Sequence, residues 1–115
     1  GGNWRNLSSD VAEKYMGKAY HSKGGRTGFA RRLDRDTYCP TLTTSLVQKM
    51  TGFCHPLENR PLTVREAARV QGFPDWYTFS GSLSSQYRQI GNAVPVTVAF
   101  GVATSIKGYL DRKNV

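Results

Sequence analysis

The clearest candidate for chemistry in this sequence is a concentration of cationic side chains in the first third of the chain. Six basic residues and one acidic residue, Asp34, lie between positions 18 and 35, and together they supply five of the eight net positive charges: Lys18, Lys23, Arg26, Arg31, Arg32 and Arg35. Ammonium and guanidinium groups at this density favour a polyanionic partner such as a phosphate backbone.

A glycine-rich stretch interrupts this basic segment. Residues 23–28 read KGGRTG, so a flexible backbone flanked by cations could approach a ligand closely. An ordinary surface loop is the alternative. A nucleoside triphosphate loop is not expected, because the Lys-Ser/Thr pair that completes such a loop does not follow.

Two thiols are the other reactive groups in the sequence. Cys39 and Cys54 lack the spacing of metal ligands and are too few for a disulfide framework, so we expect free structural thiols and no metal site. Cys54 is followed by His55, but neighbours in sequence do not by themselves form a nucleophile–base pair.

The spacing of apolar residues changes along the chain from a strand-like to a helical pattern. Residues 29–47 read as short strands, and Thr41-Leu42-Thr43-Thr44 is strongly β-prone. From residue 61 the spacing becomes helical: Thr63 and Glu66 form a capping box, and the helix should end at Gly72. A second short helix is expected from Ser84 or Ser85 to about Gly91.

A third helix is predicted from Pro95 to about Asp111. Val98, Val102, Ile106 and Tyr109 share one stripe, which Phe100 and Leu110 broaden. This surface is too apolar for a small lone domain, so we expect it to dock on a partner or on a larger parent. The chain also begins without methionine, consistent with its being part of something larger. Since no signal peptide or transmembrane run is visible, we expect a soluble intracellular protein without a membrane partner.

Two long motifs carry a resemblance to a known family. RPLTVREAARVQGFPD at residues 60–75 resembles the ninth conserved motif of the DNA cytosine-5 methyltransferases, and QYRQIGNAVPV at 86–96 is similar to the tenth and last. Upstream, FARRL at 29–33 leading to PTLT at 40–43 resembles the target-recognition region, including its Thr-Leu pair. Together these matches span about residues 24–106.

The resemblance implies an α+β fold in three parts. Residues 1–60 would form an irregular, β-rich target-recognition region, 61–82 the ninth-motif helix and connector, and 83–115 the tenth-motif turn and C-terminal helix. The C-terminal helices would pack on a Rossmann-like methyltransferase domain absent from this chain. The chain would then be either an excised part of an enzyme or the small subunit of a split one.

The resemblance also implies a cofactor contact. In the family, the tenth motif borders the pocket for S-adenosylmethionine, so Asn92, Ala93 and Val94 are expected to lie close to it, and the missing domain would complete the site. Asn92 can offer backbone and amide hydrogen bonds. The alternative is that Gly91-Asn92 is merely a left-handed helix stop.

Contacts with double-stranded DNA are implied for the basic segment. The family turns its target cytosine out of the duplex, and protein contacts must offset the cost of unstacking. By resemblance, the loop at 24–28 enters near the vacated position, Arg31 or Arg32 reads a guanine edge, and Thr41 contacts the backbone. Lys23 and Arg26 are expected on phosphates. The predicted DNA-binding residues are Lys23, Gly24, Gly25, Arg26, Gly28, Arg31, Arg32 and Thr41.

Structural rather than catalytic roles are expected within the ninth motif. Arg65, Glu66 and Arg69 would organise the recognition region, with Glu66 in a salt bridge to Arg65, Arg69 or another arginine. The aromatic residues Trp76, Tyr77 and Phe79 could stack on bases, but we expect them to pack.

The sequence lacks the parts that the family uses for chemistry. Cys39-Pro40 reverses the catalytic Pro-Cys order, and neither a Phe-x-Gly-x-Gly cofactor motif nor a Glu-Asn-Val motif is found. We therefore expect no catalytic residue here and no activity from this chain alone.

With the rest of the enzyme, it would serve a DNA (cytosine-5-)-methyltransferase that moves methyl from S-adenosylmethionine to C5 of a flipped cytosine. The expected setting is the bacterial cytoplasm or nucleoid, in enzymes of the restriction-modification kind. A stand-alone DNA-binding module, or a methyltransferase remnant without catalysis, is the alternative.

Overall fold

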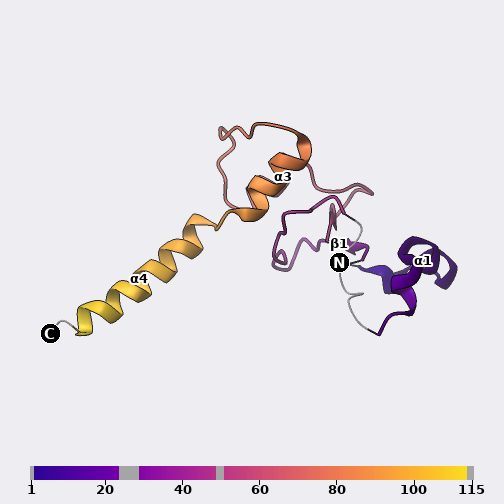
Figure 1. Ribbon diagram of the computed structural model, residues 1–115, viewed down its shortest axis with the longest axis horizontal. Coiled ribbons are helices and arrows are strands. Elements are labelled where there is room, and N and C mark those ends of the chain that lie inside the picture. The colour runs from indigo at the N-terminus through magenta and orange to yellow at the C-terminus, as the bar shows by residue number, and fades with distance from the viewer. Residues whose placement is uncertain (1, 24–28, 49–50, 114–115) are drawn as a thin grey trace.

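The computed structural model describes residues 2–23, 29–48 and 51–113 (Figure 1). Four residues predicted to bind DNA, Gly24, Gly25, Arg26 and Gly28, lie outside this part. The elements in chain order are two 3-10 helices around an α-helix, two short strands and three α-helices: η1 (Trp4–Asn6), α1 (Ser9–Met16), η2 (Gly17–His21), β1 (Arg31–Arg32), β2 (Phe53–Cys54), α2 (Val64–Val70), α3 (Leu83–Asn92) and α4 (Val96–Lys113).

The molecule is elongated because α4 projects from the rest of the chain (Figure 1). Its principal extents are 64 × 35 × 26 Å and its radius of gyration is 18.0 Å. A compact domain of this length would have a radius of gyration of roughly 13 Å. The C-terminal helix is therefore held at one end only.

The two strands pair in parallel, Arg31 with Phe53 and Arg32 with Cys54. The N-terminal segment joins this sheet through a bridge between Gly2 and Arg32, and Pro61 bridges to Cys54 from the other side. The mixed α and β character is thus present, but the prediction of a β-rich region over 1–60 is wrong for the described residues, where helices α1, η1 and η2 precede two two-residue strands.

Residues 41–44 form no strand despite their composition. Leu42 is buried in the main core, and the backbone of Thr43 and Thr44 packs against Gly91 in α3. β-propensity expresses itself where a neighbouring strand is available for pairing. A helix takes that place here, so the segment stays irregular.

One hydrophobic core joins Leu42, Leu46 and Phe53 to helices α2 and α3. Ile90 is fully buried, and the cluster comprises Leu42, Leu46, Phe53, Leu62, Ala67, Ala68, Phe79, Tyr87 and Ile90. A smaller group of buried residues, Ala12, Met16 and Phe29, lies at the N-terminal end, where the Tyr15 ring meets the Phe29 ring edge-on at 6.2 Å. In contrast, residues 34–41 are exposed throughout.

The predicted caps of α2 are confirmed. Thr63 accepts from the backbone N–H of Glu66, and the Glu66 carboxylate accepts from the backbone N–H of Thr63. At the other end Gly72 has φ +84°, and Phe73 N–H donates to Ala68 C=O. With the bond from Gly72 N–H to Arg69 C=O, these contacts form a Schellman motif.

Helix α3 begins one residue earlier than predicted, because Ser82 caps it by accepting from Ser85 N–H. It includes both Gly91 and Asn92. The described glycines with positive φ are Gly17, Gly72 and Gly81, so the alternative of a left-handed stop at Gly91 is wrong.

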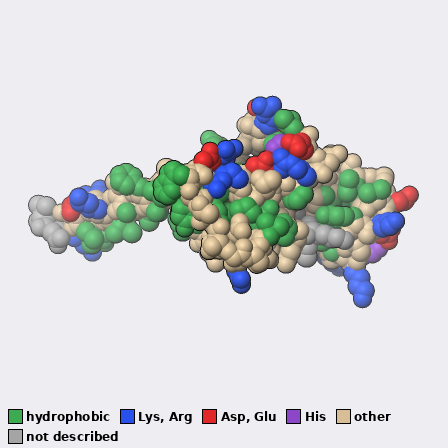
Figure 2. Space-filling model, turned by 90° about the horizontal axis from the view of Figure 1, so that it is seen from above, with side chains coloured by type: hydrophobic (Ala, Val, Ile, Leu, Met, Phe, Trp, Pro, Cys, Tyr) green, Lys and Arg blue, Asp and Glu red, His purple; other side chains and the backbone are tan. Residues whose placement is uncertain are grey.

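Helix α4 follows the predicted range closely, and none of its side chains is buried. Large apolar side chains cover much of its surface, as the green atoms on the projecting arm in Figure 2 show. By length and composition alone the segment Leu83–Lys113 could cross a membrane, since its most apolar window has a mean hydropathy of 1.3. This differs from the expectation that no such run is present.

Candidate nucleic-acid interface and tenth-motif turn

The structure brings a predicted DNA contact and two predicted cofactor contacts to one cavity. A hollow of about 490 Å³ is lined by Thr41 and by Ala93 and Val94 after α3. Gln71 and Val98 also line it, so it lies where residues 38–42, the end of α2 and the start of α4 converge. Asn92 is exposed at the end of α3.

A close backbone contact at Gly91 holds this junction together. A Cβ atom placed on Gly91 would lie 2.5 Å from the carbonyl carbon and oxygen of Thr43 and 2.6 Å from the nitrogen of Thr44. Real Cβ atoms do not approach backbone atoms so closely, so only glycine permits this packing. Glycine is therefore required at position 91 by a tertiary contact and not by a turn conformation.

The side-chain amide of Gln71 holds the same junction from another side. Its Nε2 donates to the carbonyls of Ile90 at 3.1 Å and Ala93 at 2.6 Å. Sequence reasoning missed this residue. The available signal was its place between the last apolar residue of α2 and Gly72, where a side chain can turn away from the helix.

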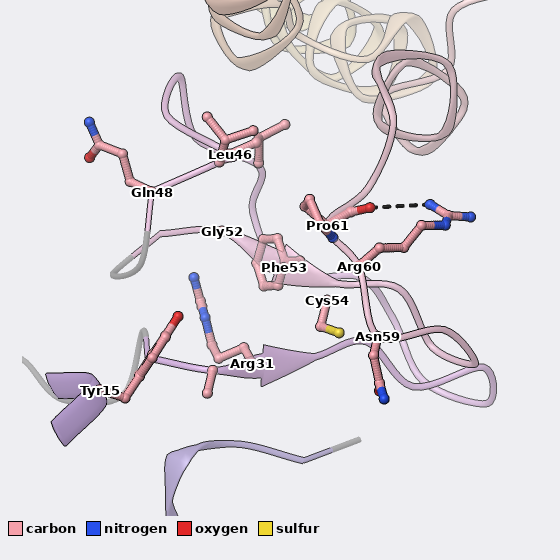
Figure 3. A pocket seen from close by; sticks show the side chains of 12 residues that line it. Tyr15, Arg31, Leu46, Gln48, Gly52, Phe53, Cys54, Asn59, Arg60 and Pro61 are labelled. Atoms are coloured by element: carbon pink, nitrogen blue, oxygen red, sulfur yellow. Dashed lines mark hydrogen bonds between the residues drawn. The ribbon is translucent and has the colours of Figure 1, made fainter. Parts of the chain in front are cut away.

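Arg31 lies on the wall of a second cavity, of about 320 Å³ (Figure 3). Its guanidinium carbon lies 4.2 Å from the centre of the Phe53 ring. Figure 3 shows Arg31 entering from β1 and Tyr15 from α1, with Gln48 near the rim. The Nε atom of Arg31 is buried and has no hydrogen-bond partner among the described residues.

Arg32 is engaged within the chain. Its guanidinium donates to the carbonyls of His55 and Glu58, the latter at 2.9 Å, and to Oδ1 of Asn59 at 2.6 Å. Successive residues of a strand point to opposite faces, which separates Arg31 from Arg32. Arg32 thus fastens the loop at 55–59 to β1.

Glu66 pairs with Arg60, one of the alternatives expected from the sequence. The two guanidinium nitrogens of Arg60 donate to the two carboxylate oxygens at 2.7 and 2.8 Å. The pKa of Glu66 falls from 4.5 to about 2, first because of these bonds and then because the Thr63 backbone N–H donates to the carboxylate. Nε2 of His55 lies 3.7 Å from Oε1 of Glu66.

Arg65 and Arg69 both hold the segment after α2. Arg65 donates to the carbonyls of Pro74 at 3.3 Å and Tyr77 at 2.9 Å. Arg69 pairs with Asp75 through two bonds of 2.8 and 2.9 Å, which lower the pKa of that carboxyl. These contacts leave the three ninth-motif side chains engaged inside the chain.

The aromatic residues after the ninth motif divide into two kinds. Phe79 is buried, and Phe73, Tyr77 and Phe79 form a triangle with ring centres 4.9 to 5.0 Å apart. Their packing agrees with the expectation for Tyr77 and Phe79. Trp76 differs, because 80% of it is exposed.

The thiols and the remaining predicted residues stay apart. Cys39 is exposed, and Sγ of Cys54 donates to Glu58 C=O at 3.3 Å, while Nδ1 of His55 accepts from backbone N–H groups. Within the described ranges, His, Cys, Asp and Glu side chains form no cluster able to hold a metal. Lys23 and Thr41 are both exposed.

This basic, mixed α and β chain carries the ninth- and tenth-motif patterns on adjoining helices. A family model described as C-5 cytosine-specific DNA methylase matches residues 2–108. The chain therefore belongs to the C-5 cytosine-specific DNA methylase family.

Curated relatives match the chain along nearly all its length. Type II methyltransferase M.Sau96I of Staphylococcus aureus is 52% identical over 114 residues, covering 99% of the chain and 26% of the relative. Type II methyltransferase M.Eco47II of Escherichia coli is 52% identical, with 99% and 27% covered. DNA (cytosine-5)-methyltransferase 3 of Arabidopsis thaliana is 36% identical, with 100% and 9% covered. The chain thus spans about a quarter of the length of the two bacterial relatives.

Proposed function

We propose that this chain is the target-recognition and C-terminal portion of a DNA (cytosine-5-)-methyltransferase. The complete enzyme would transfer methyl from S-adenosylmethionine to C5 of a cytosine turned out of duplex DNA. The observation that supports this best is the cavity where Thr41 of the recognition segment meets Ala93 and Val94 of the tenth motif. A DNA-reading segment and a cofactor-facing turn need to adjoin in such an enzyme.

The DNA-facing role falls on the basic segment. Lys23 is exposed and suited to a phosphate, and the same contact is proposed for Arg26, with Gly24, Gly25 and Gly28 near the vacated base position. Thr41, also exposed, would contact the backbone.

Of the two arginines proposed to read bases, Arg31 has the better claim. Its side chain lines a cavity and is not bound to the loop at 55–59. The guanidinium of Arg32 donates its hydrogen bonds to the loop at 55–59, which favours a role in positioning that loop. A bidentate contact from Arg31 to a guanine edge would contribute about 1 to 3 kcal/mol of discrimination.

The cofactor-facing role falls on residues 92–94. Asn92 and Val94 are exposed and flank Ala93, so the Asn92 amide is free to face a polar ligand while Val94 covers an apolar part of it. S-adenosylmethionine would supply the electrophilic methyl group, and the catalytic domain would complete its site. Within this chain, the residues only bind and orient.

Helix α4 would dock on the catalytic domain. Seven of its large apolar side chains are at least half exposed: Val96, Val98, Phe100, Val102, Ile106, Tyr109 and Leu110. Burying one such side chain against a protein surface contributes about 1.5 to 3 kcal/mol of favourable free energy, so exposure of this surface to water is unfavourable.

A protein domain fits this helix better than a bilayer does. The residues at 93–95 interrupt the helical run between α3 and α4, and Lys107 ends the uncharged part of α4. The remaining uncharged part, 96–106, is about 16 Å long at 1.5 Å per residue. A bilayer core is about 30 Å thick.

Methyl transfer provides the test. Labelled methyl from S-adenosylmethionine would be followed into cytosine-containing duplex DNA, with this chain alone and with the polypeptide that carries the Pro-Cys and cofactor motifs. We expect activity only in the mixture. Activity from the chain alone would contradict its lack of a nucleophile. If neither sample is active although the partner folds and binds the cofactor, the stand-alone DNA-binding module is the better explanation.

A further inference from the structure

The end of helix α3 depends on a side chain from another element. A helix leaves its last carbonyls without intrahelical partners. The Ile90 carbonyl accepts from Ala93 N–H and from Gln71 Nε2, and the Ala93 carbonyl accepts from Gln71 Nε2 at 2.6 Å. Both N–H groups of one amide are thus used to close this helix end.

These hydrogen bonds hold the start of the short connector between α3 and α4. Residues 93–95 are the non-helical link between α3 and α4, and α4 makes no buried contact that could fix its own direction. The bond from Gln71 ties Ala93, the first residue of this link, to the end of α2. The direction in which the chain leaves α3 therefore depends on this amide.

Residues 43 and 44 pack against the end of the same helix. Gly91, two residues before Ala93, lies against the backbone of Thr43 and Thr44. Gln71 itself is half-buried and lines the cavity shared by Thr41 and Val94. The end of α3 is therefore fixed by residues 43 and 44 at Gly91, and the connector is fixed by Gln71 at Ala93.

We propose that Gln71 is a positioning residue, which fixes the Ala93 carbonyl and thereby sets where residues 92–94 face S-adenosylmethionine. This inference rests on the proposed function and adds a residue that acts through the Ala93 carbonyl. The chemistry required is a pair of N–H donors. A carboxylate of the same shape would face two carbonyl oxygens and push them away, and a thioether of the same length would leave them without a donor.

The test uses the complete enzyme, assembled from this chain and its catalytic portion. We expect Gln71→Met to raise the KM for S-adenosylmethionine by about tenfold and Gln71→Glu by more, as two lost hydrogen bonds imply. The kcat at saturating cofactor and the KM for DNA should change less than about threefold, since reacting groups and DNA contacts are untouched. Direct titration with S-adenosylmethionine should show the same loss of affinity without turnover.

Gln89→Met is the matched control. The amide of Gln89 also donates two hydrogen bonds, to the Ser80 carbonyl and to the Ser85 hydroxyl, but neither involves the connector. This variant should keep the wild-type affinity for the cofactor. Thermal unfolding of each assembled enzyme shows that folded proteins are compared.

The outcomes separate this inference from the proposed function. An assembled wild-type enzyme that transfers no methyl refutes the proposed function itself. With an active wild type, an unchanged cofactor affinity in Gln71→Met overturns the positioning role. So does a variant in which kcat, both KM values and the unfolding temperature worsen together, because that pattern reports only a structural residue.

Discussion

Replacing Gly91 by alanine should destabilise this chain, although the substitution occurs inside a helix. Alanine is normally favoured over glycine in a helix by about 1 kcal/mol. At Gly91 the added Cβ would lie 2.5 to 2.6 Å from backbone atoms of Thr43 and Thr44. Those backbone atoms cannot rotate away as a flexible side chain could. An ordinary contact between carbon atoms is about 3.5 Å, so α3 and residues 43–44 must move apart by nearly 1 Å.

The steric cost exceeds the gain in helix propensity. Overpacking of this kind costs typically 1 to 3 kcal/mol, and backbone atoms on both sides place Gly91→Ala toward the upper end. After subtraction of the propensity term, the free energy of unfolding should fall by about 1 to 2 kcal/mol. For a chain of this size, that corresponds to a fall in Tm of roughly 5 to 10 °C.

Circular dichroism during thermal and urea unfolding measures the effect. Gly101→Ala in α4 is the control, because apart from its chain neighbours and the backbone of its own helix no described atom lies within 4 Å of its Cβ position. That variant should keep or slightly raise the helical signal. If Gly91→Ala proves as stable as the parent chain, the tight packing of Thr43 and Thr44 on α3 would be refuted.

Four further substitutions test the remaining assignments. Arg31→Ala should relax the sequence preference of the assembled enzyme more than it flattens the salt slope, and uniform weakening on all duplexes would make Arg31 a phosphate contact. Arg32→Ala should instead lower the free energy of unfolding by about 1 to 3 kcal/mol, since it removes bonds to the loop at 55–59; unchanged urea unfolding would contradict this. Because the folded pKa of Glu66 is depressed to about 2, its contribution is full above pH 4.5 and is lost toward pH 2. Glu66→Gln should therefore cost about 1 to 2 kcal/mol at pH 7 and little near pH 2, and a pH-independent difference would count against the pairing with Arg60. Ile106→Asp should leave unfolding of the isolated chain unchanged, because Ile106 is 56% exposed, but weaken its co-elution with the catalytic portion; undiminished co-elution would exclude docking through this face.

The helices could be predicted from the sequence because their signals are local. Thr63 with Glu66 marks the start of α2, and Gly72 marks its end, through contacts within a few residues. The apolar surface of α4 could likewise be predicted from the spacing of its apolar residues. In the structure none of its side chains is buried.

Residues 29–54 were harder to predict because their structure depends on contacts between residues distant in sequence. Thr41–Thr44 has strand-forming residue types, yet α3 occupies the place where a pairing strand would lie. The parallel pairing of β1 with β2 joins residues more than twenty positions apart, and two-residue strands leave almost no periodic signal.

The roles of individual side chains were likewise predictable only where their contacts are local in sequence. Arg31 and Arg32 are indistinguishable as neighbours in sequence, and only the fold shows that one is engaged by the loop at 55–59. For Gln71 the sequence offered only its place before Gly72 and did not indicate its partners, because the carbonyls it binds lie 19 and 22 residues away.

The exposed segment at 34–41 has a consequence for how such a chain can diverge. It runs between Leu33, packed against the core, and Leu42, buried within it, while no residue between them is buried. Lengthening a free loop costs only about 0.6 kcal/mol for each doubling. Insertions and exchanges here would change this exposed surface while Gly91 and Gln71 keep their packing. Under the proposed function, exchanging residues 34–41 for those of a relative is therefore a route to changed DNA specificity that leaves the packed part of the chain intact.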